Sequence, residues 1–76
     1  MNDLTEGRIV HFVMADGQHR PGIVVRVWSA TCINLILFVD GSNDGYDPNL
    51  PLDWKTSIVY SSESKEPGTW HWIEGD

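Results

Sequence analysis

The side chains best suited to ligand chemistry lie on short β-rich runs, where polar residues interrupt apolar ones. Arg26 and Trp28 are two residues apart, so on a strand they would share one face. A guanidinium offers forked donors to an anion, and an indole offers a flat surface on which a base or sugar can stack. The pair therefore predicts a surface that holds a small anionic or nucleotide-like ligand.

Further polar residues can join this pair if the strands align suitably. His11, Asn34 and His71 alternate with apolar neighbours and would point away from a core. Three residues of a later loop could close the site. The predicted ligand-binding residues are His11, Arg26, Trp28, Asn34, Asn43, Asp44, Trp54 and His71. The alternative is that these side chains only face water, as polar residues on outward faces commonly do.

Metal binding and catalysis find less support in the same residues. The stretch 40–45 (DGSNDG) has the oxygen-bearing residues and glycine that open a calcium loop, but Pro51 stands where a bidentate glutamate is required. His11, His19 and His71 show no ligand spacing such as H-x-x-x-H. Ser61, Ser62 and Ser64 belong to a polar turn and have no nucleophile-elbow context. We therefore expect no metal, no cofactor and no enzyme activity.

Five β-rich runs must position the candidate residues. Turn-forming or polar stretches separate them, and they cover residues 8–15, 22–29, 33–39, 56–61 and 70–74. Residues 41–55 show no periodic pattern and predict a long loop. Antiparallel strands joined in order predict an all-β fold, namely a small five-stranded SH3-like barrel or meander, with an OB-like barrel as the alternative.

Alternation within these runs predicts which side chains form the core. In the second and third runs the predicted core residues are Ile23, Val25 and Val27, followed by Ile33, Leu35, Leu37 and Val39. In the first run His11 would point to the face of the strand opposite to that of Val10 and Phe12. In the last run Trp70 and Trp72 would share the core side, opposite His71. The motif Trp70-His71-Trp72 is therefore expected to close the core rather than to form one aromatic surface.

Composition limits the remaining classes of function. The 76 residues predict a single domain. The formal charge of −6 comes entirely from residues 36–76, which contain eight carboxylates and only two lysines. A field of this sign repels a phosphate backbone, so we expect no binding to the DNA backbone. The longest apolar run, 35–39, is far too short to cross a membrane. A lone cysteine and an acidic N-terminus indicate an intracellular protein.

Several sequence blocks together resemble a family of small proteins encoded by tailed bacteriophages. The blocks are GRIVHF (7–12), VVRVWS (24–29), NLILFVDGSNDG (34–45), TSIVY (56–60) and PGTWHWIE (67–74). Relatives often carry valine where Leu37 stands and proline where Ile73 stands, and the loop from Tyr46 to Lys55 is the least similar part. The resemblance implies a phage accessory protein of the host cytoplasm or the virion.

Two functions follow as expectations. The first is a non-catalytic binding module that captures a small anionic or nucleotide-like ligand, for example as an anti-defence sponge for a host signalling nucleotide. The alternative is a structural protein of the phage head or tail, or one that binds a host protein. Because a chain of 76 residues offers little concave surface, we expect a homo-oligomer in which subunit boundaries supply the pocket.

Overall fold

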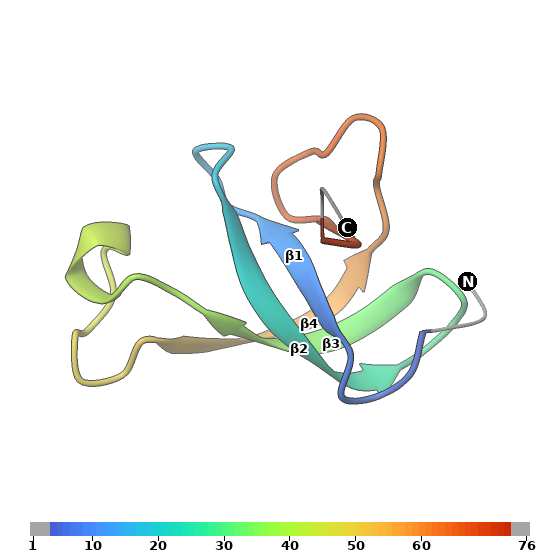
Figure 1. Cartoon of the computed structure of the whole chain (residues 1–76), viewed down its shortest axis with the longest axis horizontal. Helices are drawn as coiled ribbons and strands as arrows, with labels where there is room; N and C mark the ends of the chain where they lie inside the picture. The colour runs from blue at the N-terminus through green and yellow to red at the C-terminus, as the bar shows by residue number, and fades with distance from the viewer. Residues whose placement is uncertain (1–3, 74–76) are drawn as a thin grey trace.

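The computed structural model describes residues 4–73, which fold into a curled antiparallel sheet (Figure 1). Its strands are β1 (Ile9–Val13), β2 (His19–Val27), β3 (Cys32–Phe38), β4 (Leu52–Val59) and β5 (Trp70–His71), and the short 3-10 helix η1 (Gly41–Asp44) follows β3. The strand order is β4-β3-β2-β1-β5. This all-β order is that of a small SH3-like barrel or meander, as predicted. In residues 4–73 no helix is long and apolar enough to span a bilayer.

β2 is the strand that joins the two halves of the sheet. Its first residues pair with β1, whereas the residues from Gly22 onward also pair with β3. Figure 1 shows β1 and β2 crossing β3 and β4 at a steep angle, which gives the sheet its curl. Gly22 lies at this crossing, where an added Cβ would be 3.1 Å from Leu35 Cδ1 and 3.2 Å from the Ile36 carbonyl oxygen.

β5 contacts both β1 and the segment that follows β4, and so brings the two edges of the curled sheet together. His11 pairs with His71, and Phe12 pairs with Trp70. On its other side, Trp70 forms a parallel bridge to Tyr60, just after β4, and the Ser61 amide donates to the Trp70 carbonyl at 2.9 Å. The indole of Trp70 also donates to the Thr31 carbonyl at 2.9 Å. These contacts connect the two ends of the strand order.

The core lies inside the curl. It consists of Leu4, Val10, Phe12, Val24, Ile33, Leu35, Leu37, Val39 and Trp70. The prediction for the third run is confirmed, because all four of its expected core residues are buried. Trp70 is fully buried, and Trp72 packs against the same cluster with its ring centroid 5.4 Å from that of Trp70. The pair closes the core, as expected.

The predicted core face of the second run is right at Val27 and wrong at Ile23 and Val25, which lie on the outer side of the sheet. Val24 is buried, whereas Val25 is 42% exposed, because the pairing with β3 shifts register between Val24 and Arg26. Such a bulge adds one residue to a strand and reverses the alternation beyond it. Val27 consequently packs against the core. Arg26 lies on the outer face and is the cross-strand partner of Asn34.

The fourth and fifth runs also differ in length from expectation. β4 begins at Leu52, so residues 52–55 belong to a strand and the predicted loop is shorter. β5 contains only Trp70 and His71, and residue 74, where the predicted run ended, lies outside the described residues. The consequence for the site is that Trp54 is held on a strand, where it pairs with Ile36.

Candidate ligand-binding site

Arg26 and Trp28 form a stacked pair at the end of β2. The Arg26 guanidinium carbon lies 3.9 Å from the centroid of the Trp28 ring, and Trp28 remains 51% exposed. A guanidinium in this position gains cation–π attraction and keeps its edge donors available to a ligand. The structure therefore places these two residues together on the outer surface, as the sequence predicted.

Asn34 fixes the orientation of the Trp28 ring through a hydrogen bond with its indole nitrogen. Its side chain is buried, with 7% exposure, and its Oδ1 accepts from the Trp28 indole at 2.8 Å. The same oxygen accepts from the Thr56 hydroxyl at 3.0 Å and from the Ser57 amide at 2.8 Å. Asn34 is thus a positioning residue that joins β3, β4 and Trp28, and it offers a ligand little surface of its own.

The backbone of Ser57 explains why an asparagine side chain is needed at position 34. Its φ angle is +56°, in the left-handed region that residues other than glycine seldom adopt. The pairing of β3 with β4 shifts register between Ile33 and Leu35, so the ladder is interrupted opposite this residue. The Asn34 oxygen supplies the acceptor that the Ser57 amide uses there.

The other predicted strand residues, His11 and His71, lie in a second group. They face each other as partners of β1 and β5, with ring centroids 5.7 Å apart. His11 also pairs with Pro21, which precedes Arg26 by five residues on β2 and so lies about 16 Å away along an extended strand. The five strand residues consequently form two groups on the outer face rather than one patch.

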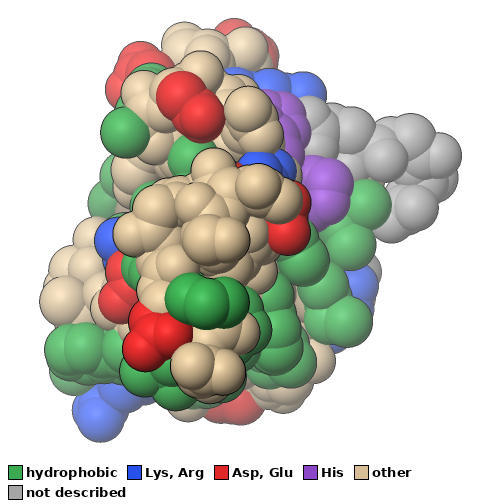
Figure 2. Space-filling model, turned by 90° about the vertical axis from the view of Figure 1, so that its left-hand side faces the viewer, with side chains coloured by type: hydrophobic (Ala, Val, Ile, Leu, Met, Phe, Trp, Pro, Cys, Tyr) green, Lys and Arg blue, Asp and Glu red, His purple; other side chains and the backbone are tan. Residues whose placement is uncertain are grey.

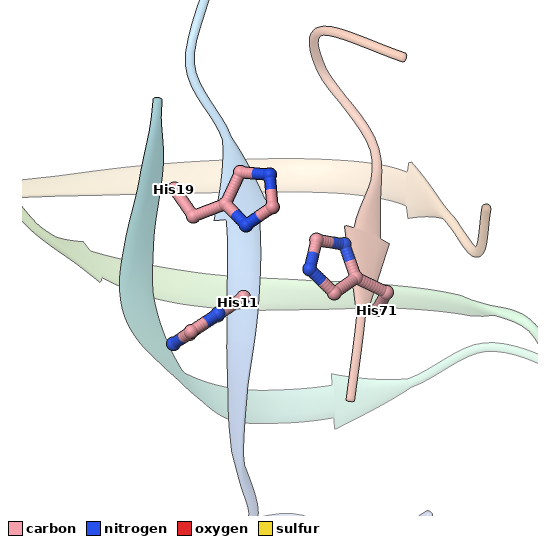
Figure 3. A group of neighbouring side chains, drawn as sticks. All are labelled: His11, His19 and His71. Atoms are coloured by element: carbon pink, nitrogen blue, oxygen red, sulfur yellow. The ribbon is translucent and has the colours of Figure 1, made fainter. Parts of the chain in front are cut away.

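His19 completes the second group. The sequence interpretation had weighed it as a metal ligand, rejected it for lack of a ligand spacing, and left it out of the predicted ligand-binding residues. From β2 its ring reaches a centroid distance of 4.6 Å from His71 and 5.8 Å from His11. Figure 3 shows the three side chains as close neighbours carried by β1, β2 and β5, with the rings of His19 and His71 turned toward each other. His71 is only 2% exposed, whereas the other two are half-buried. Figure 2 shows that histidine side chains reach the surface together.

Asn43 and Asp44 lie in η1, which follows β3. Trp28 lies at the other end of β3, in the turn that joins β2 to β3. Arg20 holds Asp44 with two contacts, from Nε to Oδ2 at 2.7 Å and from Nη2 to Oδ1 at 2.6 Å. This hydrogen bonding lowers the pKa of Asp44 and raises the pKa of Arg20. The Asn43 amide donates to Asp40 at 3.2 Å. These polar groups therefore bind one another and position the turn.

A groove of about 500 Å³ opens between the β1–β2 turn and the segment that follows η1. Its lining residues are Phe12, Val13, Met14, Ala15, Asp44, Tyr46, Lys55, Pro67 and Gly68. The Tyr46 hydroxyl donates to Asp53 at 2.8 Å, which raises the pKa of Tyr46. Burial alone would raise the pKa of Asp53, but hydrogen bonds from Tyr46 and Lys55 outweigh it and lower that pKa. The groove is mostly apolar, and Asp44 and Lys55 are the charged residues that line it.

Trp54 belongs to an apolar band on the outer face of the sheet. The pairings Ile9–Ile23, Ile23–Ile36 and Ile36–Trp54 place four side chains in one row across β1, β2, β3 and β4. Phe38 and Leu52 form the neighbouring pair. Trp54 is 59% exposed and Ile9 is 50% exposed. A row of exposed apolar residues on paired strands is typical of an interaction surface.

The fold and its side chains define a small SH3-like β-sheet domain with an arginine–tryptophan pair, a three-histidine cluster and an exposed apolar band. No protein-family model matches the chain, and neither curated proteins nor solved structures give a match. The geometry of the side chains is therefore the basis for assigning a function.

Proposed function

We propose that this protein is a non-catalytic accessory binding module of a phage, which captures a small anionic or nucleotide-like ligand in the host cytoplasm. The observation that supports the proposal most directly is the Arg26–Trp28 pair, with 3.9 Å between the guanidinium carbon and the ring centroid. Arginine can bind a phosphate through its edge while its flat face remains against an aromatic ring. A nucleotide offers both the anion and the planar base that this surface can bind.

The surroundings of the pair favour a small ligand over a polymer. The acidic excess of the chain, −6, opposes a long phosphate backbone, whereas one cation can hold one phosphate locally. Asn34 holds the indole in place before any ligand arrives, so less conformational freedom is lost on binding. Capture of a host signalling nucleotide as an anti-defence sponge would use such a surface, and no catalytic group is required for it.

Adenosine monophosphate and adenosine are suitable probes, with the intrinsic tryptophan fluorescence and calorimetry as readouts. Arg26→Ala should weaken binding of the monophosphate about 10- to 150-fold, the equivalent of one charge-assisted hydrogen bond. Adenosine should bind weakly to both proteins, because it has no phosphate. Arg26→Lys is the matched control, since it keeps the charge but loses the fork and the flat face, and it should bind with intermediate affinity.

Folding must be measured in the same variants. Arg26 is exposed, so its replacement should leave the urea midpoint unchanged within the error of the measurement. If the monophosphate binds Arg26→Ala as tightly as the original chain, or does not bind the original chain at all, the proposal is wrong for this ligand class.

A structural or host-protein-binding role is the second candidate, and the apolar band favours it. Trp54, Ile36 and Ile23 form adjacent pairs on the outer face, and Trp54 is largely exposed. We propose that the same band holds a second copy of the chain in a homo-oligomer. Sedimentation of Trp54→Asp should then report a smaller species than the original chain. Mass spectrometry of purified virions separates the two functions, because a particle component is abundant there and a sponge is absent.

A further inference from the structure

We infer that His11, His19 and His71 form a binding site for a zinc-class transition-metal ion. Each of the three histidines offers a ring nitrogen, and these nitrogens all lie within 4.8 Å of one another. Imidazole is a preferred ligand of zinc, and three histidines with one open position are an established zinc geometry. The site uses none of the residues of the Arg26–Trp28 pair.

The strand register is what brings the ligands together. His11 on β1 is the direct partner of His71 on β5, so both side chains project from the same face of the sheet. His11 is also the partner of Pro21, and His19 precedes Pro21 by two residues, which returns its side chain to that face. Three neighbouring strands thus each contribute one ligand, and the backbone fixes their positions.

The spacing of the nitrogens is close to that of a tetrahedral site. Zinc–nitrogen bonds of about 2.0–2.1 Å place ligand nitrogens about 3.4 Å apart in a tetrahedron. In the structure these nitrogens lie within 4.8 Å of one another, so metal binding requires the nitrogen–nitrogen distances to shorten only modestly. Small rotations of the half-buried His11 and His19 rings can achieve this. Both ring nitrogens of His71 are buried, so its ring forms the inner wall and an ion would enter past the other two.

An ion in this position would have a structural effect and would leave one coordination position open. β5 is only two residues long, and a metal on His71 would tie it to β1 and β2. The fourth position would be occupied by water or by a small anion. Because the metal would bind the folded state alone, it would also stabilise that state against unfolding.

Zinc titration of the intact chain tests the proposal directly. Calorimetry should give one zinc ion per chain, and magnesium should not bind because it prefers oxygen ligands. Two-dimensional NMR of the imidazole nitrogens should show zinc-dependent shifts in all three rings, and the chain has no other histidine. Binding that shifts fewer than three rings would overturn the assignment, as would the absence of zinc binding.

Variants locate the ion. His19→Ala and His11→Ala should each lower zinc affinity about tenfold or more, since loss of a ligand costs at least as much as loss of its supporting contact. Cys32→Ser and Arg26→Ala are the controls and should bind zinc as the original chain does. Unchanged affinity in both histidine variants would refute the site, and so would loss of affinity in Cys32→Ser. Nucleotide capture lost in Arg26→Ala with zinc binding retained would separate this inference from the proposed function.

Discussion

Replacement of Asn34 by alanine should destabilise the protein more than its position on an outer face suggests. The Oδ1 of Asn34 accepts hydrogen bonds from Trp28, Thr56 and Ser57, at 2.8, 3.0 and 2.8 Å. Each such bond contributes about 0.5–1.5 kcal/mol net, and a buried donor left unsatisfied costs more. Water can reach the half-exposed indole, so the total loss should be about 2–3 kcal/mol.

Urea unfolding followed by far-ultraviolet circular dichroism measures this loss. In a domain of this size about 4–8 °C of melting temperature corresponds to each kcal/mol, so Asn34→Ala should melt about 10–20 °C lower. Asn34→Asp keeps an oxygen acceptor and should lose less than half as much. Thr56→Val removes one of the three donors and should cost about 1 kcal/mol.

Two results would refute this reasoning. One is an Asn34→Ala protein within about 0.5 kcal/mol of the original chain, which is the range of ordinary surface substitutions. The other is a Thr56→Val protein that is destabilised as much as Asn34→Ala, since the shared oxygen would then not be the common acceptor.

Gly22→Ala should lower the free energy of unfolding by about 1–3 kcal/mol, because the new methyl group would crowd Leu35 and a backbone oxygen; an unchanged urea midpoint would contradict this. Asp44→Asn should flatten the acid limb of the stability profile. The folded-state pKa of Asp44 is below its ordinary 3.8, so its contribution is present above that value and is lost as the pH falls through the folded-state pKa. Parallel profiles down to about pH 2 would contradict the linkage. Tyr46→Phe should flatten the alkaline limb, because the raised pKa of Tyr46 means that its contribution is present below pH 10.0 and is lost as the pH rises through the folded-state pKa. Equal losses above pH 10.0 in both proteins would show that Tyr46 is not the group responsible.

The sequence was sufficient for the fold class and for the regular strands. In β3 the alternation of Ile33, Leu35 and Leu37 with other residues follows an uninterrupted strand, and all three are buried. In β2 the same argument failed at Ile23 and Val25, because a bulge inserts a residue and the consecutive apolar residues 23–25 do not reveal where it lies. Residues 52–55 were missed as a strand because Pro51 and Asp53 have low strand propensity, and pairing with β3 overrides it.

The candidate site was predicted in part. Arg26 and Trp28 were correctly expected on an outer face, whereas Asn34 is buried, and its bond from Trp28 depends on a cross-strand register that single runs do not specify. The histidine cluster escaped detection because its ligands come from three strands, so no short spacing along the chain reveals them. His11 and His71 lie in predicted β-rich runs, whereas His19 lies in the turn-forming stretch between two runs, so no signal in the sequence pointed to it.

The pairing of β1 with β5 has a consequence for the order in which the chain folds. β1 to β4 can form successive hairpins as soon as each is synthesised, but β1 gains its second neighbour only when Trp70 and His71 arrive. Until then one edge of β1 is unpaired, and the position that Trp70 fills beside Tyr60 is empty. Contacts that span most of the chain form slowly, and open strand edges promote aggregation in partly folded chains. Closure by two late residues should therefore be the slowest step of folding, and it should determine how long a nascent chain remains prone to aggregation.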